Sequence, residues 1–215
     1  TIVALRVVAC MAKYVGLDPA SKGWFGVVLE DEGWETDLFP SILSVWKYHS
    51  DAERILLDVP IGLPNDGRRT CDAAARAKLG RQGRRVFYTP IRDAVYSRNI
   101  DEAKRINESA GYSVQNGAWS LVPRIREVDE FLDVYPNARD RFHETHPEVC
   151  FYGLNGRNAL EAPKRSDEGV ARRKALLAEE YRESATIYEE SVEQYTTPAY
   201  APTVGGVDDI LDALV

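Results

Sequence analysis

Cysteine is scarce in this 215-residue chain, and its three cysteines, Cys10, Cys71 and Cys150, lie far apart in the sequence. Because no two of them form a CxxC pair, we expect neither a disulfide framework nor a zinc site with thiolate ligands. Such sparse, unpaired cysteines are typical of proteins that stay in a reducing compartment. We therefore expect a cytoplasmic location.

Long hydrophobic runs are absent as well. No segment approaches the roughly 18 to 20 apolar residues that a membrane-spanning helix needs, so no membrane partner is expected. The opening segment is short, contains Arg6, and lacks both the basic start and the small-residue cleavage site of a signal peptide. We interpret residues 1–10 as an N-terminal extension in front of a natural start at Met11.

The chain has no excess of positive charge. It contains 27 lysines and arginines against 34 aspartates and glutamates, a net charge of −7, which argues against a generally basic surface for nucleic acid. Basic residues are nevertheless dense between positions 68 and 92, where Asp72 is the only acid. Such a segment can bind a polyanion locally, or it can be an ordinary solvated helix and loop. Its candidate phosphate-binding residues are Arg68, Arg69, Arg81, Arg84 and Arg85.

Several common catalytic motifs are missing. The chain has no GxxxxGK(S/T) motif, which excludes a P-loop, and no GxSxG nucleophile elbow. The sequence HETH at residues 143–146 differs from the HExxH of zinc proteases, and on a strand its two histidines would point to opposite faces. The segment DPASKG at residues 18–23 is a poor version of a phosphotransferase phosphate loop, so that function is a weaker alternative.

The order of the apolar segments predicts an α/β domain with a mixed sheet and flanking helices. The run at residues 55–59 is apolar up to Asp58, which is typical of a strand buried on both faces. A turn at residues 19–23 is expected to end the first strand. The sheet is predicted to contain strands at residues 14–18, 24–30, 35–39, 55–59 and 141–145.

The middle of the chain predicts a mainly helical insertion at about residues 66–138, within a single domain at residues 11–215. Its longest helical period is interrupted by Pro123, a residue that removes a backbone hydrogen bond from a helix. Pro147 is well placed to begin a helix after the last strand, and Ser166 to cap another. Helices are expected at residues 42–46, 70–79, 101–109, 114–132, 167–180 and 207–215.

Acidic residues stand at the ends of the predicted elements. Asp18 and Asp58 each close a strand, and Glu148 lies in the first turn of the helix after the last strand. Each of these acids could instead be an ordinary turn residue or a first-turn acid. On the final helix, three aspartates share one face at spacings of three and four residues, namely Asp208, Asp209 and Asp212.

In an open α/β sheet, the functional edge is the one at which the C-terminal ends of the strands emerge. If the first and fourth strands are parallel neighbours, Asp18 and Asp58 lie side by side at that edge. Clustered carboxylates repel one another unless a cation neutralises them, and oxygen ligands suit Mg²⁺ or Mn²⁺. Two such ions about 4 Å apart can hold a phosphodiester, activate water and stabilise the leaving oxygen. The acids therefore predict a divalent-metal site.

Several segments of the chain resemble known nucleases. The segment GLDPASKGWFGVV resembles the first hairpin of ribonuclease-H-like nucleases, including Holliday-junction resolvases, and DxxDAL at residues 209–214 resembles the paired aspartates on their last helix. The segments LDVPIGLP, RRTCDAAARAKLGRQGRRVFYTP, IREVDEFL and HPEVCFYGLNG are similar to the predicted-nuclease family called domain of unknown function family 429. This resemblance runs from about Tyr14 to Leu214. It implies a ribonuclease-H-like fold and a metal-dependent nuclease activity.

Matched to these motifs, Asp18 corresponds to the acid of the first strand, and Asp209 and Asp212 correspond to the pair on the terminal helix. The second acid of the resolvase pattern is usually a glutamate that is reached differently along the chain, so Asp58 and Glu148 compete for that role. The resemblance thus implies a catalytic, metal-binding set of Asp18, Asp58, Glu148, Asp209 and Asp212. Lys22 and Lys164 join the basic segment as candidate contacts to substrate phosphates.

The leading hypothesis is a nuclease that hydrolyses phosphodiester bonds of DNA or RNA by a two-metal carboxylate mechanism with Mg²⁺ or Mn²⁺. The alternative is a catalytically inactive nucleic-acid-binding module on the same fold. The full set of acids favours the nuclease. A metal ion bound between Asp18, Asp58 and Asp212 would separate the two hypotheses.

Overall fold

A five-stranded sheet forms the centre of the computed structural model, which describes residues 12–31, 33–200 and 206–215. The strand order is β3-β2-β1-β4-β5. The extension interpreted at residues 1–10 lies outside the described residues. The strands are β1 (Tyr14–Ala20), β2 (Gly23–Glu30), β3 (Gly33–Phe39), β4 (Arg54–Leu57) and β5 (Phe142–Glu144).

The sheet is mixed. β1, β2 and β3 pair in antiparallel fashion, whereas β4 runs parallel to β1 and β5 runs parallel to β4. Parallel neighbours need crossover connections, and helices supply them before β4 and before β5. This mixed sheet with flanking helices is consistent with a ribonuclease-H-like fold, so the predicted fold class is confirmed. The parallel pairing of the first and fourth strands is also confirmed.

Most helices lie in two segments of the chain. The chain between β4 and β5 is mainly helical, and further helices follow β5. Among the helices of the described residues, none combines the length and the apolar character that crossing a bilayer requires. The helices are α1 (Ile42–His49), α2 (Thr70–Leu79), η1 (Gly80–Arg85), α3 (Arg92–Val95), α4 (Ile100–Asn107), η2 (Glu108–Ala110), α5 (Asn116–Val134), η3 (Pro136–Ala138), α6 (Pro147–Leu154), α7 (Asp167–Glu180), α8 (Ser184–Tyr195) and α9 (Val207–Leu214), where η denotes a 3₁₀ helix.

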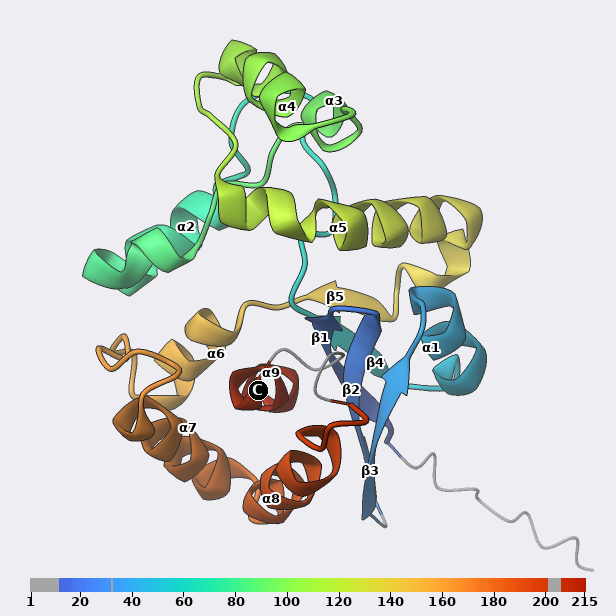
Figure 1. Cartoon of the computed structure of the whole chain (residues 1–215), viewed down its shortest axis with the longest axis vertical. Coiled ribbons are helices and arrows are strands. Elements are labelled where there is room, and N and C mark those ends of the chain that lie inside the picture. The colour runs from blue at the N-terminus through green and yellow to red at the C-terminus, as the bar shows by residue number, and fades with distance from the viewer. Residues whose placement is uncertain (1–11, 32, 201–205) are drawn as a thin grey trace, which may run out of the picture.

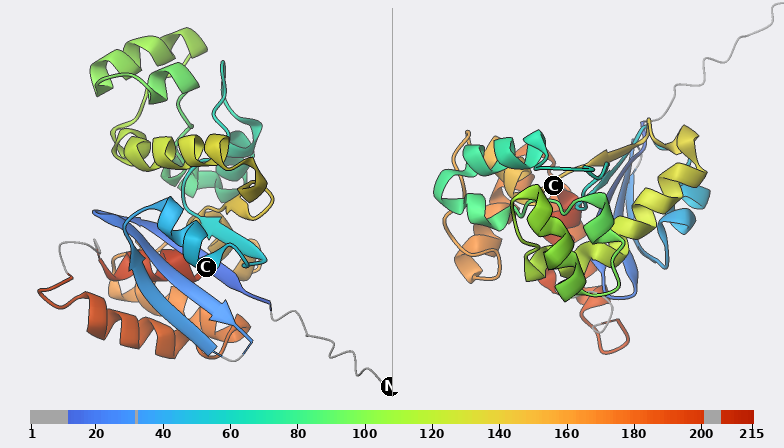
Figure 2. Two further views of the ribbon diagram at one scale, coloured as in Figure 1. Left: turned by 90° about the vertical axis from the view of Figure 1, so that its right-hand side faces the viewer. Right: turned by 90° about the horizontal axis from the view of Figure 1, so that it is seen from above.

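Helices cover both faces of the sheet, because successive side chains of its central strands are apolar. Trp24 and Val28 of β2 belong to a hydrophobic cluster with α1 and α5. Phe25 and Val27 point to the opposite face and belong to a cluster with α7, α8 and α9. Figures 1 and 2 show the sheet between these helices, with α3 and α4 at the end of the molecule farthest from β3.

The ends of β1 and β4 differ from the predicted boundaries. β1 continues to Ala20, so Asp18 lies inside this strand, whereas β4 ends at Leu57, directly before Asp58. Past Leu17, β1 pairs with β2 but no longer with β4. One edge of β1 is therefore without a strand neighbour at Pro19, where a proline is tolerated.

Two helical predictions are wrong in detail. Pro123 does not interrupt α5. Val122 and Ile125, on either side of the proline, are buried in the same hydrophobic cluster. Burial of each such side chain stabilises the fold by about 1.5–3 kcal/mol. The two contributions together offset the roughly 3 kcal/mol that a proline inside a helix costs. The predictions also lack α8, whose apolar residues are interspersed with acidic and small polar ones. Burial of Ile187 and Tyr188 against the neighbouring elements holds this helix in place.

Candidate metal centre

Three carboxylates from distant parts of the chain lie together where β4 ends beside β1. Asp18 comes from β1, Asp58 directly follows β4, and Asp212 comes from α9. Each offers a ligand oxygen, and these three oxygens all lie within 4.8 Å of one another. Asp18 and Asp212 are buried, and Asp58 is half-buried. A carboxylate cluster of this size could hold a metal ion.

The strand register brings Asp18 and Asp58 together. Leu17 and Leu57 are partners in the parallel ladder, so the two aspartates are the next residues in register on adjacent strands. The backbone amide of Asp58 donates a hydrogen bond of 3.2 Å to the carbonyl of Leu17, which fixes this register. Residues in register on adjacent strands point to the same face of the sheet. Asp18 and Asp58 therefore both face α9.

A glycine in β1 lets α9 approach and deliver Asp212. A Cβ atom built on Gly16 would lie only 2.0 Å from the carbonyl oxygen of Ala213 in α9. Gly16 and Asp18 are two residues apart and thus share the face of β1 that α9 covers. Because the helix backbone rests directly on Gly16, Asp212, next to Ala213, lies beside Asp18. Close backbone approach of this kind is a common reason for glycine in a strand.

Burial raises the pKa values of all three carboxyl groups, and neighbouring acids add to this effect. Burial, together with the charges of Asp58 and Asp212, raises the pKa of Asp18 well above its ordinary value. Burial and the charge of Asp212 raise the pKa of Asp58 to about 7. Burial also raises the pKa of Asp212, although Lys164 opposes this effect. A bound cation would offset the repulsion that keeps protons on this cluster.

Lys164 supplies positive charge at one side of the cluster. Its Nζ atom lies 2.7 Å from Asp212 Oδ2 and 2.9 Å from Asp208 Oδ2, and Arg165 Nε lies 3.1 Å from the same Asp208 oxygen. Burial alone would lower the pKa of Lys164, but Asp212 and Asp208 outweigh burial and raise it. Lys164 and Arg165 likewise lower the pKa of Asp208 despite its burial. Within the described residues, neither Asp18 nor Asp58 forms an ion pair.

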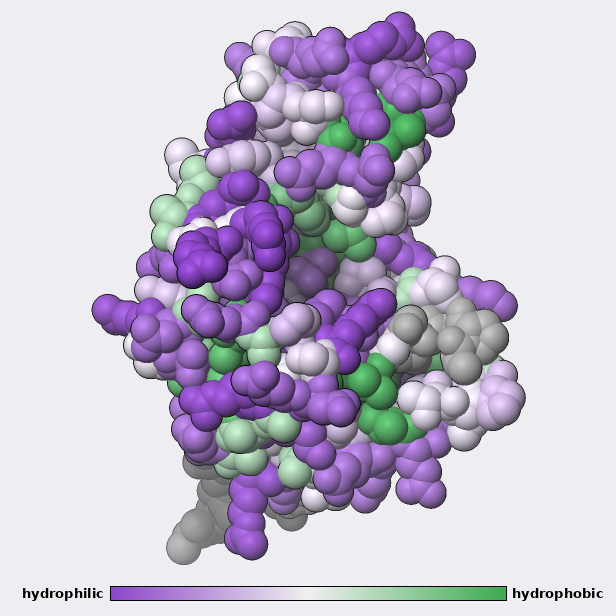
Figure 3. All heavy atoms as spheres, turned by 60° about the vertical axis from the view of Figure 1, so that its left-hand side comes forward, coloured by the Kyte–Doolittle hydropathy of each residue, from purple (hydrophilic) through white to green (hydrophobic). Residues whose placement is uncertain are grey.

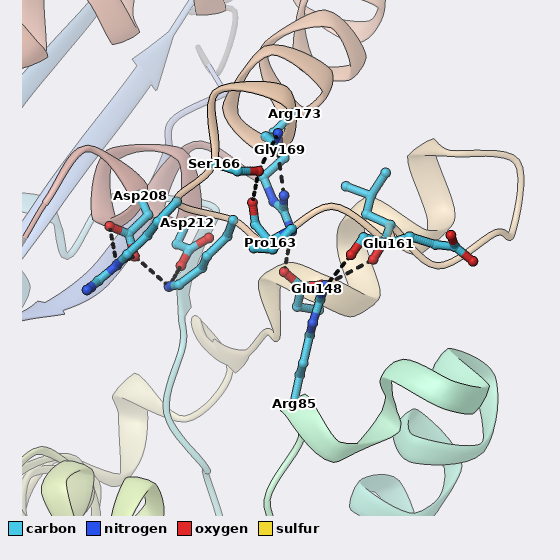
Figure 4. Close-up of polar contacts among 12 residues, drawn as sticks. Arg85, Glu148, Glu161, Pro163, Ser166, Gly169, Arg173, Asp208 and Asp212 are labelled. Atoms are coloured by element: carbon cyan, nitrogen blue, oxygen red, sulfur yellow. Dashed lines mark hydrogen bonds and ion pairs between the residues drawn. The ribbon is translucent and has the colours of Figure 1, made fainter.

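Two of the predicted metal ligands lie outside the set of three. Asp209 is on α9 and half-buried, and its charge contributes to the raised pKa of Asp18. Glu148 is buried between two arginines: Arg85 Nη1 lies 2.5 Å from its Oε2, and Arg173 Nη2 pairs with its Oε1. Figure 4 shows Glu148 between Arg85 and Arg173, with Asp208 and Asp212 together on α9. The carboxylate of Glu148 thus already has two cationic partners.

The predicted phosphate-binding residues divide into paired and exposed groups. Arg69 pairs with Asp72 at 2.5 Å and with Glu144 at 2.7 Å, and Arg85 pairs with Glu148. Lys164 pairs with the aspartates of α9. The exposed group consists of Lys22, Arg68, Arg81 and Arg84. The guanidinium of Arg68 lies over the rings of Tyr88 and Tyr112, at 4.4 and 5.3 Å from their centroids.

A pocket of about 490 Å³ adjoins the carboxylate cluster, and Asp58 belongs to both. Its walls come from α2, from residues 86–89, and from the end of β5 and the start of α6. The pocket could not be predicted from the sequence, because three segments that are separate in the chain line it. The sequence feature that could have pointed to the pocket is the segment RRTCDAAARAKLGRQGRRVFYTP at residues 68–90, because it contains more than half of the lining residues.

Comparison with known proteins identifies a family. A family model described as "Protein of unknown function (DUF429)" matches residues 16–215, a span that contains Asp18, Asp58 and Asp212. No curated protein and no solved structure gives a significant match. The family description names no activity, but the expected membership is confirmed. The chain belongs to the DUF429 family of proteins of unknown function.

Proposed function

We propose that this protein is a metal-dependent nuclease that hydrolyses phosphodiester bonds of DNA or RNA, with Asp18, Asp58 and Asp212 as ligands of Mg²⁺ or Mn²⁺. The observation that supports this proposal is the convergence of three carboxylate oxygens within 4.8 Å at one edge of the sheet. A ribonuclease-H-like sheet with acids at this edge suits metal-assisted hydrolysis.

The donor set fits a hard divalent cation. All three candidate ligands are carboxylates, and oxygen-only sets favour Mg²⁺ and Mn²⁺ over softer metals. Asp18 and Asp58 have no cationic partner among the described residues, so their burial is otherwise poorly compensated. When bound, the ion would activate water and stabilise charge on the phosphate in the transition state. The protein itself positions the ligands through the β1–β4 register and the contact of α9 at Gly16.

The two-metal form of this mechanism requires further ligands beside Asp212. Asp209 is the predicted candidate, and Lys164 would have to leave Asp212 for a second ion to bind there. Equilibrium titration with Mn²⁺ distinguishes a one-metal from a two-metal mechanism, because it measures whether one or two ions bind per chain. If one ion binds, the ammonium of Lys164 supplies the second positive charge beside the phosphate.

Exposed basic residues next to the pocket suit a nucleic-acid partner. Arg81 and Arg84 lie on η1, directly after α2, and Arg68 directly precedes α2. Contacts between such residues and phosphates supply most of the sequence-independent affinity for nucleic acid. We therefore propose Arg68, Arg81 and Arg84 as the phosphate-binding residues. Arg69 and Arg85 hold acids of the protein instead.

The second candidate function is nucleic-acid binding without cleavage. The observation that favours it is the ion pair of Lys164 with Asp212, because a lysine can partly neutralise the cluster without any metal. This alternative predicts binding that neither needs metal nor depends on Asp18.

The test is cleavage of labelled single-stranded, duplex and branched DNA and RNA in Mg²⁺ or Mn²⁺, with chelator as the metal-free condition. We expect cleavage to need metal and to fall by on the order of a hundredfold in Asp18→Asn. Asparagine keeps the shape of the side chain and removes a repulsive charge, so folding should be retained. The matched control is Glu193→Gln, an exposed acid on α8. Undiminished cleavage by Asp18→Asn would contradict the proposal, and binding without any cleavage would support the alternative.

We also propose a cytoplasmic location. Cys71 and Cys150 are free thiols, as a reducing compartment allows. Labelling of these thiols in intact cells before lysis would test the location, and quantitative protection from labelling by a disulfide would contradict it.

A further inference from the structure

The pocket beside Asp58 is built like a site for a small organic group. Its volume of about 490 Å³ falls within the range of known small-molecule sites, roughly 300–1,000 Å³. Much of its wall is apolar, with Ala75 from α2, Val86 and Phe87 after η1, and Val149 from α6. Figure 3, which brings the side of α2 and α6 forward, shows a hollow with hydrophobic residues beside it.

Two residues that line the pocket have buried polar atoms without a hydrogen-bond partner in the described part of the chain. Thr89 is fully buried, and its hydroxyl makes no hydrogen bond within the described part of the chain. The Nδ1 atom of His146, another lining residue, is likewise buried and without a partner there. Buried polar atoms are nearly always hydrogen-bonded in native proteins. Two such atoms in residues that line one pocket suit a ligand with polar atoms at its edge.

The backbone of Thr89 is held on both sides, which fixes its position in the pocket wall. Its amide donates a 2.8 Å hydrogen bond to the buried carboxylate of Asp72, and its carbonyl accepts a 2.7 Å hydrogen bond from Tyr112. Asp72 is in turn held by Arg69. The backbone from which the Thr89 side chain projects is thus held rigidly, which favours a preorganised site.

We propose that this pocket binds a nucleobase whose phosphate lies at the carboxylate cluster. A base has an apolar, aromatic face, which suits the apolar wall and Phe87, and a polar edge, which suits Thr89 and His146. Asp58 lines the pocket and belongs to the cluster, so base and phosphate would belong to the same or adjacent nucleotides. This inference rests on the proposed nuclease function and narrows its substrate to an unpaired nucleotide, either within a strand or free. A base within a duplex would first have to leave the stack.

The test uses two alanine-to-phenylalanine variants of α2 that differ only in which alanine is replaced. Ala75→Phe fills the pocket, whereas Ala77→Phe places the same side chain on the exposed face of α2, outside the lining. Binding is measured in Ca²⁺ by the fluorescence of single-stranded oligonucleotides that carry 2-aminopurine at successive positions. We expect Ala75→Phe to weaken binding by about tenfold or more and to abolish the fluorescence change, and Ala77→Phe to leave both unchanged. If Ala75→Phe fails to fold, Thr89→Val, which keeps the side-chain shape, should weaken binding about fivefold.

Abasic substrates and free nucleotides complete the experiment. Removing the base at the recognised position should weaken binding to the wild type by about tenfold and have no further effect on Ala75→Phe. Nucleoside monophosphates that compete with the oligonucleotide would identify free nucleotides as a second source of the base. If an abasic strand binds and is cleaved like the intact strand, the pocket inference is overturned and the nuclease proposal stands. If bases bind in the pocket but no nucleic acid is cleaved, the pocket inference stands and the nuclease proposal fails.

Discussion

Replacing Asp58 by asparagine tests whether the three carboxylates are arranged to share a cation. Asparagine has nearly the same shape as aspartate but cannot ionise. Burial and the charge of Asp212 raise the pKa of Asp58 from 3.8 to about 7 in the folded protein. Between these two values, the folded chain holds a proton at Asp58 that the unfolded chain has lost.

The sign of the resulting pH dependence follows from proton linkage. Because the folded state binds more protons than the unfolded state, the free energy of unfolding falls as pH rises from about 4 to about 7, and levels off above that window. Each pH unit contributes up to about 1.4 kcal/mol. Over the whole interval this amounts to roughly 3 kcal/mol, once solvent screening of a half-buried side chain is allowed for.

The assay is denaturant unfolding followed by circular dichroism. With chelator, we expect Asp58→Asn to be more stable than the wild type by roughly 3 kcal/mol at about pH 8 and to approach it at about pH 3, where Asp58 is mostly protonated in both states. Added Mn²⁺ should narrow or reverse this difference, since the wild type gains about 2.7 kcal/mol at a metal concentration of 100 Kd. Asp58→Asn lacks one metal ligand, so Mn²⁺ should stabilise this variant less than the wild type.

The control is Glu193→Gln, which removes the same charge from an exposed position on α8. Its stability should follow that of the wild type at every pH. If metal-free Asp58→Asn is less stable than the wild type at about pH 8, the ionised carboxylate makes a net stabilising interaction, and the reasoning from repulsion is refuted.

Three other substitutions have defined outcomes. Gly16→Ala places a methyl group 2.0 Å from the carbonyl oxygen of Ala213, so α9 must shift. We expect the free energy of unfolding, measured with denaturant, to fall by about 1–3 kcal/mol, and Mn²⁺ binding, measured by calorimetry, to weaken. Lys164→Met removes the ammonium group that pairs with Asp212 but keeps much of the apolar stem of the lysine. If the ammonium group competes with Mn²⁺ for Asp212, this variant should bind Mn²⁺ severalfold more tightly in the same calorimetric titration. Arg173→Met removes a buried partner of Glu148 and should cost about 3–5 kcal/mol in the unfolding free energy, because the carboxylate is left only with Arg85.

The sequence predicts those parts of the site that depend on local pattern. The apolar runs that end at Asp18 and Asp58 identify two strands, and a parallel pairing places both acids at one edge. Asp212 follows from the spacing of acids on a short amphipathic helix and from the resemblance to nucleases. The position of that helix on β1 depends on Gly16, and its role becomes visible only when α9 is seen to pack there.

Pairings between distant residues could not be predicted. Glu148 has the position expected of a metal ligand, in the first turn of a helix beside the sheet. Its actual partners, Arg85 and Arg173, come from η1 and α7, some 60 residues before it and 25 after it in the chain. No local pattern distinguishes a glutamate bound by arginines from one that binds a metal. For the same reason, the density of arginines between positions 68 and 92 does not reveal which of them are already paired.

The charge balance around the cluster favours a cation over a site that has lost its chemistry. Lys164 neutralises the side of the cluster formed by Asp208 and Asp212, whereas Asp18 and Asp58 have no ion-pair partner among the described residues. Burying these two acids is unfavourable, as their raised pKa values indicate. Replacing either by asparagine would relieve the repulsion without changing the packing. The proposed divalent cation would offset this repulsion by coordinating both carboxylates, which nucleic-acid binding alone would not do.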